Sequence, residues 1–159
     1  LIGRSQKGLL PLHRDEKILV IEQADTAKFL NLSNYPGMLY HECTKYNRNA
    51  AYLETSYTYD GEDVERIRNK IKEFDTVIVT NYFARGRRAN TEMIKELSGL
   101  AGKKIIVITN SPYKMTVPDN ADTVIITFSP TIENAKVVAG TLFGEVSPLG
   151  EMPVSNSDI

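Results

Sequence analysis

The chain has 159 residues, of which 42% are hydrophobic and 25% charged, and it carries a net charge of −1 at pH 7. This length suits a single domain that buries a core without disulfides or metal ions, and the composition excludes disorder over most of the chain. The balanced charge disfavours nucleic acid as a partner, and apolar runs of about five residues are far shorter than the ~20 residues that a membrane-spanning helix needs.

Short, nearly continuous apolar runs rich in Ile and Val predict strands that are buried on both faces of a parallel sheet. Four runs are clear, and a fifth, at residues 51–57, has sparser apolar positions. The four clear runs are residues 17–21, 75–80, 104–109 and 123–127.

Between these runs the apolar residues recur with the period of an α-helix. A weaker helix is predicted from Tyr35 to Tyr46, since Pro36 is acceptable in a first turn. Asn90 or Thr91 is predicted to be the N-cap of the helix that contains Met93. The other three helices are marked by apolar residues three or four positions apart: Val64, Ile67 and Ile71; Met93, Ile94, Leu97 and Leu100; and Ile132, Ala135, Val138, Ala139 and Leu142.

Helices that alternate with short buried strands are typical of βαβ crossovers. We therefore predict an α/β fold: a doubly wound, mostly parallel sheet of about five strands with helices on both faces. The chain is expected to form one domain over residues 1–159. Residues 1–16 and the Pro- and Gly-containing tail at 145–159 break the rhythm, so we expect both to be extended segments that lie against the sheet edge or another domain.

The sequence lacks the usual signatures of cofactor chemistry. It has no P-loop motif, and Glu22-Gln23-Ala24-Asp25 stands where a dinucleotide-binding fold needs a glycine-rich turn, so we predict no cofactor. A free-standing nucleotide-binding domain of flavodoxin-like topology is the weakest of three functional hypotheses. His41 and Cys43 are two positions apart on a predicted helix and cannot face one metal ion. We predict no metal site, a buried Cys43 and a partly exposed His41; the lone cysteine excludes an internal disulfide and does not fix the compartment.

Paired carboxylates are the remaining route to hydrolytic chemistry. Glu22 and Asp25 follow the first predicted strand, where ligands approach a parallel sheet, but a solvated loop is the favoured interpretation. The acidic cluster at residues 60–65 is interpreted as stabilising a helix start through the macrodipole. No residue of this chain is therefore assigned a catalytic role.

Aromatic and arginine side chains follow the strand at residues 75–80. Tyr82, Arg85 and Arg87 are candidates for the rim of a substrate site, because such groups stack on and hydrogen-bond sugars or anions. The alternative is a surface loop whose arginines pair with acids or pack on a neighbouring domain. The segment Asn110-Ser111-Pro112-Tyr113 has the same ambiguity.

Four segments, in order along the chain, resemble one known family. Leu-Phe-Gly-Glu-Val-Ser-Pro-Leu-Gly-Glu-Met-Pro-Val at residues 142–154 is similar to the segment that closes the C-terminal α/β sandwich domain of glycoside hydrolase family 3. Residues 7–12, residues 90–97 and Ser-Pro-Tyr at 111–113 resemble further segments of that domain, although Lys114 replaces an aspartate of the family pattern and Asn90 a glutamine. The β-N-acetylhexosaminidase branch is the most similar.

The resemblance implies a retaining glycosidase whose aspartate nucleophile and Asp–His acid/base pair lie on an N-terminal barrel, none of which is in this sequence. In the β-glucosidase branch a glutamate of this second domain can act as the acid, but no motif here marks one. The resemblance thus implies a C-terminal domain of a longer two-domain enzyme, and we expect this domain to be inactive alone. The start at Leu1, without an initiating methionine, separately indicates a fragment of a longer chain. Its partners would be the catalytic barrel and a saccharide with a terminal β-linked N-acetylglucosamine or glucose. The alternative is a saccharide- or protein-binding module without a catalytic role.

Overall fold

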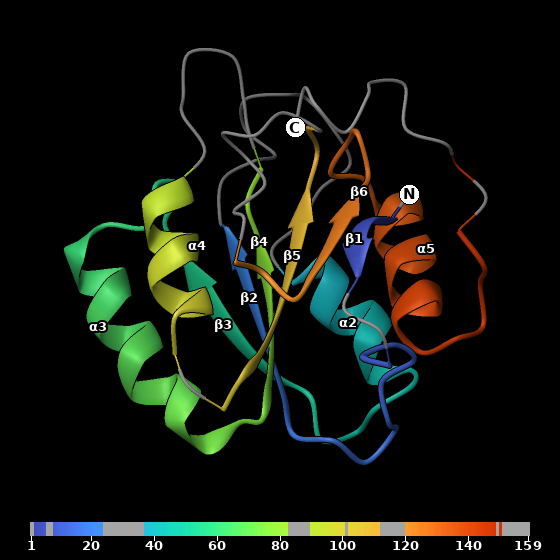
Figure 1. Ribbon diagram of the computed structural model, residues 1–159, viewed down its shortest axis with the longest axis horizontal. Coiled ribbons are helices and arrows are strands. Elements are labelled where there is room, and N and C mark those ends of the chain that lie inside the picture. The colour runs from blue at the N-terminus through green and yellow to red at the C-terminus, as the bar shows by residue number, and fades with distance from the viewer. Residues whose placement is uncertain are drawn as a thin grey trace.

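The computed structural model describes residues 2–5, 8–23, 37–82, 90–100, 102–111, 120–148 and 150. Within them, six strands form one sheet in the order β1-β6-β5-β4-β2-β3 (Figure 1). The five strands from β6 to β3 run parallel, and β1 pairs with β6 antiparallel. The strands are β1 (Ile2–Ser5), β2 (Ile18–Gln23), β3 (Ala51–Thr55), β4 (Thr76–Thr80), β5 (Lys104–Thr109) and β6 (Thr123–Ile126).

Helices cover both faces of the sheet, which confirms the predicted doubly wound α/β fold. One layer holds α3 (Gly61–Lys70) and α4 (Thr91–Ser98), with the 3-10 helix η1 (Ile71–Glu73) extending α3. The opposite layer holds α2 (Met38–Thr44) and α5 (Ile132–Leu142), which pack against each other (Figure 1). None of the described helices is long and apolar enough to cross a membrane.

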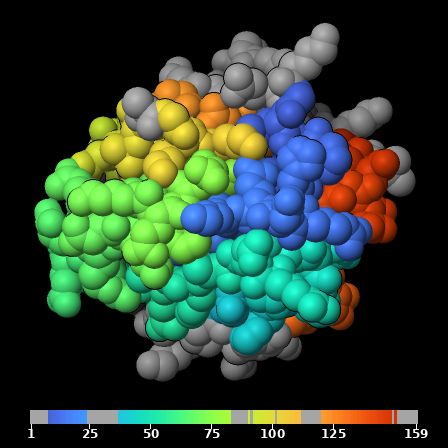
Figure 2. All heavy atoms as spheres, turned by 90° about the horizontal axis from the view of Figure 1, so that it is seen from below, coloured from blue at the N-terminus to red at the C-terminus, as the bar shows by residue number. Residues whose placement is uncertain are grey.

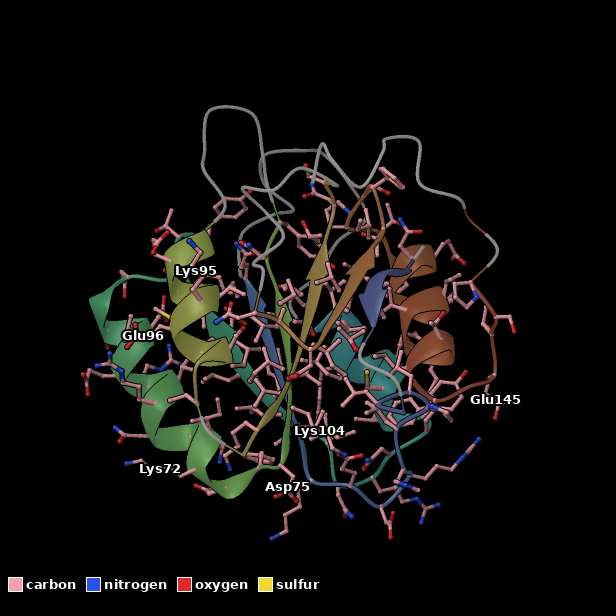
Figure 3. All side chains as sticks on the ribbon, viewed as in Figure 1. Lys72, Asp75, Lys95, Glu96, Lys104 and Glu145 are labelled. Atoms are coloured by element: carbon pink, nitrogen blue, oxygen red, sulfur yellow. The ribbon has the colours of Figure 1, made fainter. Side chains whose placement is uncertain are left out.

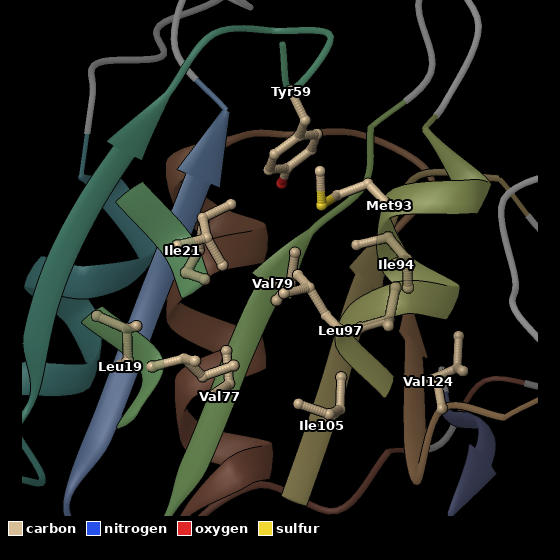
Figure 4. Packing of buried hydrophobic residues seen from close by; sticks show 14 of the residues in the cluster. Leu19, Ile21, Tyr59, Val77, Val79, Met93, Ile94, Leu97, Ile105 and Val124 are labelled. Carbon is tan, nitrogen blue, oxygen red and sulfur yellow. The ribbon is translucent and has the colours of Figure 1, made fainter. Parts of the chain in front are cut away.

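Successive residues of the central strands supply two separate hydrophobic cores, because side chains alternate between the faces of a sheet. In β2, Leu19 and Ile21 belong to the cluster under α3 and α4, whereas Ile18 and Val20 belong to the cluster under α2 and α5. Figure 4 shows the first cluster, with Tyr59 at the end nearest the carboxyl ends of the strands. Burial on both faces explains why these strands read as unbroken apolar runs.

Polar side chains fix where three helices begin. Asp60 accepts a hydrogen bond from Asp63 N at the start of α3, and Thr131 caps α5 in the same way. At α4 the cap is Asn90, whose side chain accepts from Met93 N at 2.9 Å. The two helices on the α3–α4 side also carry exposed charges, among them Lys95 and Glu96 (Figure 3).

The N-terminal segment lies against the sheet and against the end of α5. Its first part is β1, which pairs with the edge strand β6; the extended conformation was predicted, but the strand itself was not. Further along, Leu12 N donates to Leu142 O at 2.8 Å, and Arg14 forms an ion pair with Glu145. Figure 2 views the molecule from the side of the strand amino ends and shows the blue N-terminal segment beside the red end of α5. Of the predicted tail, the structure describes only residues 145–148 and 150.

Candidate functional site

The carboxyl ends of the parallel strands carry a row of buried polar side chains. Ligands of open α/β sheets bind at this edge, so these side chains form the candidate site. The middle of each of β2, β4 and β5 is occupied by buried hydrophobic residues, whereas buried polar residues lie at the strand ends. The buried polar residues are Glu22 and Gln23 at the end of β2, Thr55 at the end of β3, Thr80 and Asn81 at the end of β4, and Thr109 and Ser111 at the end of β5.

Gln23 links the ends of three segments at this edge. Its Nε2 donates to Tyr57 O, and its Oε1 accepts from Tyr82 N, both at 2.6 Å. The Tyr57 hydroxyl in turn donates to Tyr82 O at 2.8 Å. Both backbone polar groups of Tyr82 are therefore held, so the predicted rim residue starts from a fixed backbone position. Neither Gln23 nor Tyr57 was predicted to have a role in the site.

The Tyr82 side chain is half-buried and packs against the core cluster under α2 and α5. Desolvation, followed by the nearby Glu22 carboxylate, raises the pKa of the Tyr82 phenol above its usual range. The phenol is therefore neutral across the physiological range and can only stack or hydrogen-bond a ligand.

Two asparagines hold together the ends of the segment that follows β4. Asn81 N donates to Ile108 O at 2.8 Å, and Asn81 Oδ1 accepts from Asn90 N at 3.1 Å. Asn90 Nδ2 also donates to Thr58 O at 2.6 Å, so the start of α4 is tied to the segment after β3. The intervening candidates Arg85 and Arg87 lie outside the described residues.

Glu22 is a buried carboxylate that caps the start of α2. Its Oε1 accepts from Tyr40 N at 2.8 Å and its Oε2 from Leu39 N at 3.2 Å, while the residue is only 7% exposed. Desolvation raises the pKa of Glu22 to about 7, against the opposing effect of the two backbone hydrogen bonds. The predicted solvated loop is therefore wrong for Glu22, and Asp25 lies outside the described residues.

Acidic side chains at the start of α3 form hydrogen bonds and an ion pair within the domain, which agrees with the prediction that they stabilise the start of this helix. Asp60 caps the helix, and Asp63 accepts from Ser56 N at 2.8 Å and pairs with Arg66 at 3.2 Å. A cavity of about 370 Å³ lies beside these groups. The cavity is lined by Glu54, Thr55, Ser56, Asp60, Glu62, Asp63 and Arg66. Asp60 and Asp63 therefore have structural roles at the start of α3.

Cys43 and His41 occupy the environments expected for them. Cys43 is fully buried in α2, and desolvation raises the pKa of its thiol above the usual range, which disfavours the reactive thiolate. His41 is exposed. Among the described residues, no group of three or more His, Cys, Asp or Glu side chains could hold a metal ion.

The sequence matches a family model over nearly its whole length. The model is the Glycosyl hydrolase family 3 C-terminal domain, and it matches residues 4–158. The chain belongs to this family.

Solved structures of family 3 enzymes share the fold. A β-N-acetylglucosaminidase from Paenibacillus sp. superposes with a TM-score of 0.79 at 16% identity, over 96% of this chain and 29% of that one. A fungal multi-domain β-N-acetylglucosaminidase gives 0.75 at 20% identity, over 98% of this chain and 17% of that one. A β-glucosidase from Listeria innocua gives 0.73 at 15% identity, over 92% and 24%. A search of curated protein sequences finds no match.

Two of the family-like segments contact each other in this family 3 domain. Leu142 and Phe143 of the closing segment are buried, and Phe143 stacks on Tyr46 with ring centroids 5.2 Å apart. Gly144 has a φ of +78°, and a Cβ there would lie 3.0 Å from the Pro11 side chain. A glycine is therefore required both by the backbone conformation and by the close approach of the N-terminal segment.

Proposed function

We propose that this chain serves as the C-terminal domain of a glycoside hydrolase, where it supports a catalytic barrel that the sequence does not contain. The match to the family 3 C-terminal domain over residues 4–158 carries this proposal. The chain spans only 29% of the Paenibacillus enzyme, which leaves most of such an enzyme outside it.

The proposed substrate is a saccharide with a terminal β-linked N-acetylglucosamine, with β-linked glucose as the second choice. Two observations support N-acetylglucosamine over glucose. Two of the structural neighbours are β-N-acetylglucosaminidases, and residues 82–88 are similar to the β-N-acetylhexosaminidase branch. The fold alone is shared with a β-glucosidase as well, so activity must decide between the two sugars.

We place the substrate-facing side at the carboxyl edge of the sheet. Tyr82 is fixed there by Gln23 and Tyr57, and its neutral phenol suits a hydrogen bond to a sugar hydroxyl. Arg85 and Arg87 follow within the segment whose ends Asn81 and Asn90 hold together. These three side chains are proposed to line the rim of a site whose reacting groups belong to the barrel.

Two buried carboxylates of the domain, Glu22 and Asp63, support a non-catalytic role. Glu22 uses both oxygens to cap α2, and Asp63 is held by Ser56 and Arg66. Each of these carboxylates stabilises a local structure, and we propose that bond cleavage depends on groups outside this chain.

The test uses the intact enzyme that carries this domain. Its turnover of 4-nitrophenyl N-acetyl-β-glucosaminide should exceed that of the corresponding β-glucoside. Tyr82→Ala should raise KM several-fold while kcat changes less, because the residue contacts substrate and not the reacting bond. Tyr46→Ala is the matched control, since Tyr46 lies against Arg14 and Phe143 near the opposite edge. Saccharide binding without any turnover would instead favour the binding-module hypothesis.

A further inference from the structure

Phe128 is an exposed aromatic residue in a costly backbone conformation. It lies two residues beyond the end of β6, at the carboxyl edge of the sheet, and is 50% exposed. Its φ is +61°, in the left-handed region that bulky L-residues rarely adopt. Tyr59 also has a positive φ, but this residue is only 3% exposed, and its burial offsets the strain. No comparable burial offsets the strain at Phe128.

The loop around Phe128 is held by hydrogen bonds on both sides of the residue. Asn134 Nδ2, from the first turn of α5, lies 3.1 Å from Thr127 O and 2.7 Å from Ser129 O. Thr127 N donates to Thr109 O at 2.8 Å, which ties the loop to the end of β5. The strained conformation is therefore fixed by its surroundings, and the ring is presented outward from a rigid support.

Three of the four residues at 127 and 129–131, which flank Phe128 in the sequence, carry hydroxyl groups, and the fourth, Pro130, is buried. Thr127, Ser129 and Thr131 are partly exposed hydroxyl-bearing residues. The other large hydrophobic side chains that are exposed among the described residues, Val137 and Val146, lie on α5 and beyond its end. Protein interaction sites are typically marked by contiguous apolar patches of several hundred Å². One rigid ring among hydroxyl groups fits a small ligand that is apolar on one face and polar at its rim.

We propose that Phe128 is a stacking residue for a pyranose ring, so that this loop forms a saccharide subsite. A pyranose presents C–H groups on one face and hydroxyls at its edge, which matches an aromatic face surrounded by threonine and serine hydroxyls. Pre-organisation of the loop by Asn134 reduces the entropy lost on binding. The choice of a saccharide rests on the proposed function. The subsite lies two strands from Tyr82 in the sheet order, since β5 separates β6 from β4.

The inference can be tested on this chain by NMR. In a titration of the ¹⁵N-labelled protein with N,N′-diacetylchitobiose, we expect saturable shifts of the amides of residues 127–129 and Thr131. Phe128→Ala should weaken Kd by about fivefold to tenfold, the loss expected for one aromatic stacking contact. Phe128→Leu keeps an apolar side chain without a ring and should lose most of the binding, whereas Phe128→Trp should retain it. Val137→Ala removes a similarly exposed apolar side chain and should leave Kd unchanged.

Absent shifts, or equal affinities of the wild type and Phe128→Ala, would overturn the subsite. The amide spectrum of each variant reports directly whether it is folded. Glycosidase turnover by the intact enzyme is measured separately, so that turnover without binding at Phe128 overturns only this inference. A Phe128→Ala change that lowers the melting temperature of the intact enzyme without altering KM would assign the residue to a contact with the barrel and overturn the subsite as well.

Discussion

The buried Glu22 carboxyl makes a quantitative prediction about stability and pH. Burial raises its pKa from 4.5 to about 7 in the folded chain, with both oxygens held by the backbone of α2. Below pH 4.5 the group is protonated in the folded and unfolded states alike. Between the two pKa values the unfolded chain releases the proton more readily, so stability falls as the pH rises. Above pH 7 the full loss is reached.

The magnitude follows from the pKa values. A tenfold change in proton affinity corresponds to about 1.4 kcal/mol, so the rise to about 7 corresponds to a loss of about 3 kcal/mol of unfolding free energy. Glu22→Gln removes the titration while keeping the shape of the side chain. We therefore expect the wild type to lose about 3 kcal/mol more than this variant between pH 4.5 and 8.

The assay is urea unfolding at several pH values across this window. Glu133→Gln is the matched control, because Glu133 is an exposed glutamate on α5 that pairs with Lys136 and should keep the wild-type pH profile. Both histidines, His13 and His41, are present in every variant, so the comparison isolates Glu22. Equal pH profiles of the wild type and Glu22→Gln would refute the reasoning that burial controls this carboxyl.

Four further predictions concern stability. Leu97→Ala leaves a cavity in the core under α4 and should cost about 2–5 kcal/mol in urea unfolding; a loss below 1 kcal/mol would contradict its burial. Asn90→Ala removes the α4 cap and should cost about 1–2 kcal/mol by the same measurement. Phe128→Gly relieves a left-handed backbone and should stabilise the chain by about 1 kcal/mol, so a lower melting temperature would argue against strain. Burial alone would raise the pKa of Glu16, but hydrogen bonds from Lys104 and Thr76 lower it, so Glu16 contributes stability above pH 4.5 that is lost in acid; Glu16→Gln should lose less stability between pH 7 and 3.

Local sequence patterns predicted the central strands and helices because burial on both faces imposes a composition that is visible in the chain. β5 spans residues 104–109 as predicted, and Asn90 is the cap of α4. β1 was not predicted as a strand, because a short edge strand depends on pairing with β6, which no local pattern records. The N-terminal residues that pair there carry little apolar signal of their own.

The candidate site was harder to predict than the fold, because its contacts cross between elements. Tyr82 was predicted as a rim residue from its place after a strand, which is a local signal. The role of Gln23 depends on the turn after β3 and on the segment after β4, and Glu22 is buried only because the start of α2 supplies two amide groups. The sequence signals that pointed to this edge were the aromatic and arginine residues that follow the strand at 75–80 and the segment Asn110-Ser111-Pro112-Tyr113 after the next strand.

The most direct test of the account is to compare glycosidase turnover by the purified 159-residue chain with turnover by the intact enzyme that carries it. We predict hydrolysis of 4-nitrophenyl N-acetyl-β-glucosaminide by the intact enzyme and none by the chain alone. Turnover by the chain alone that survives purification and disappears with Glu22→Gln would contradict the proposal that bond cleavage depends on groups outside this domain.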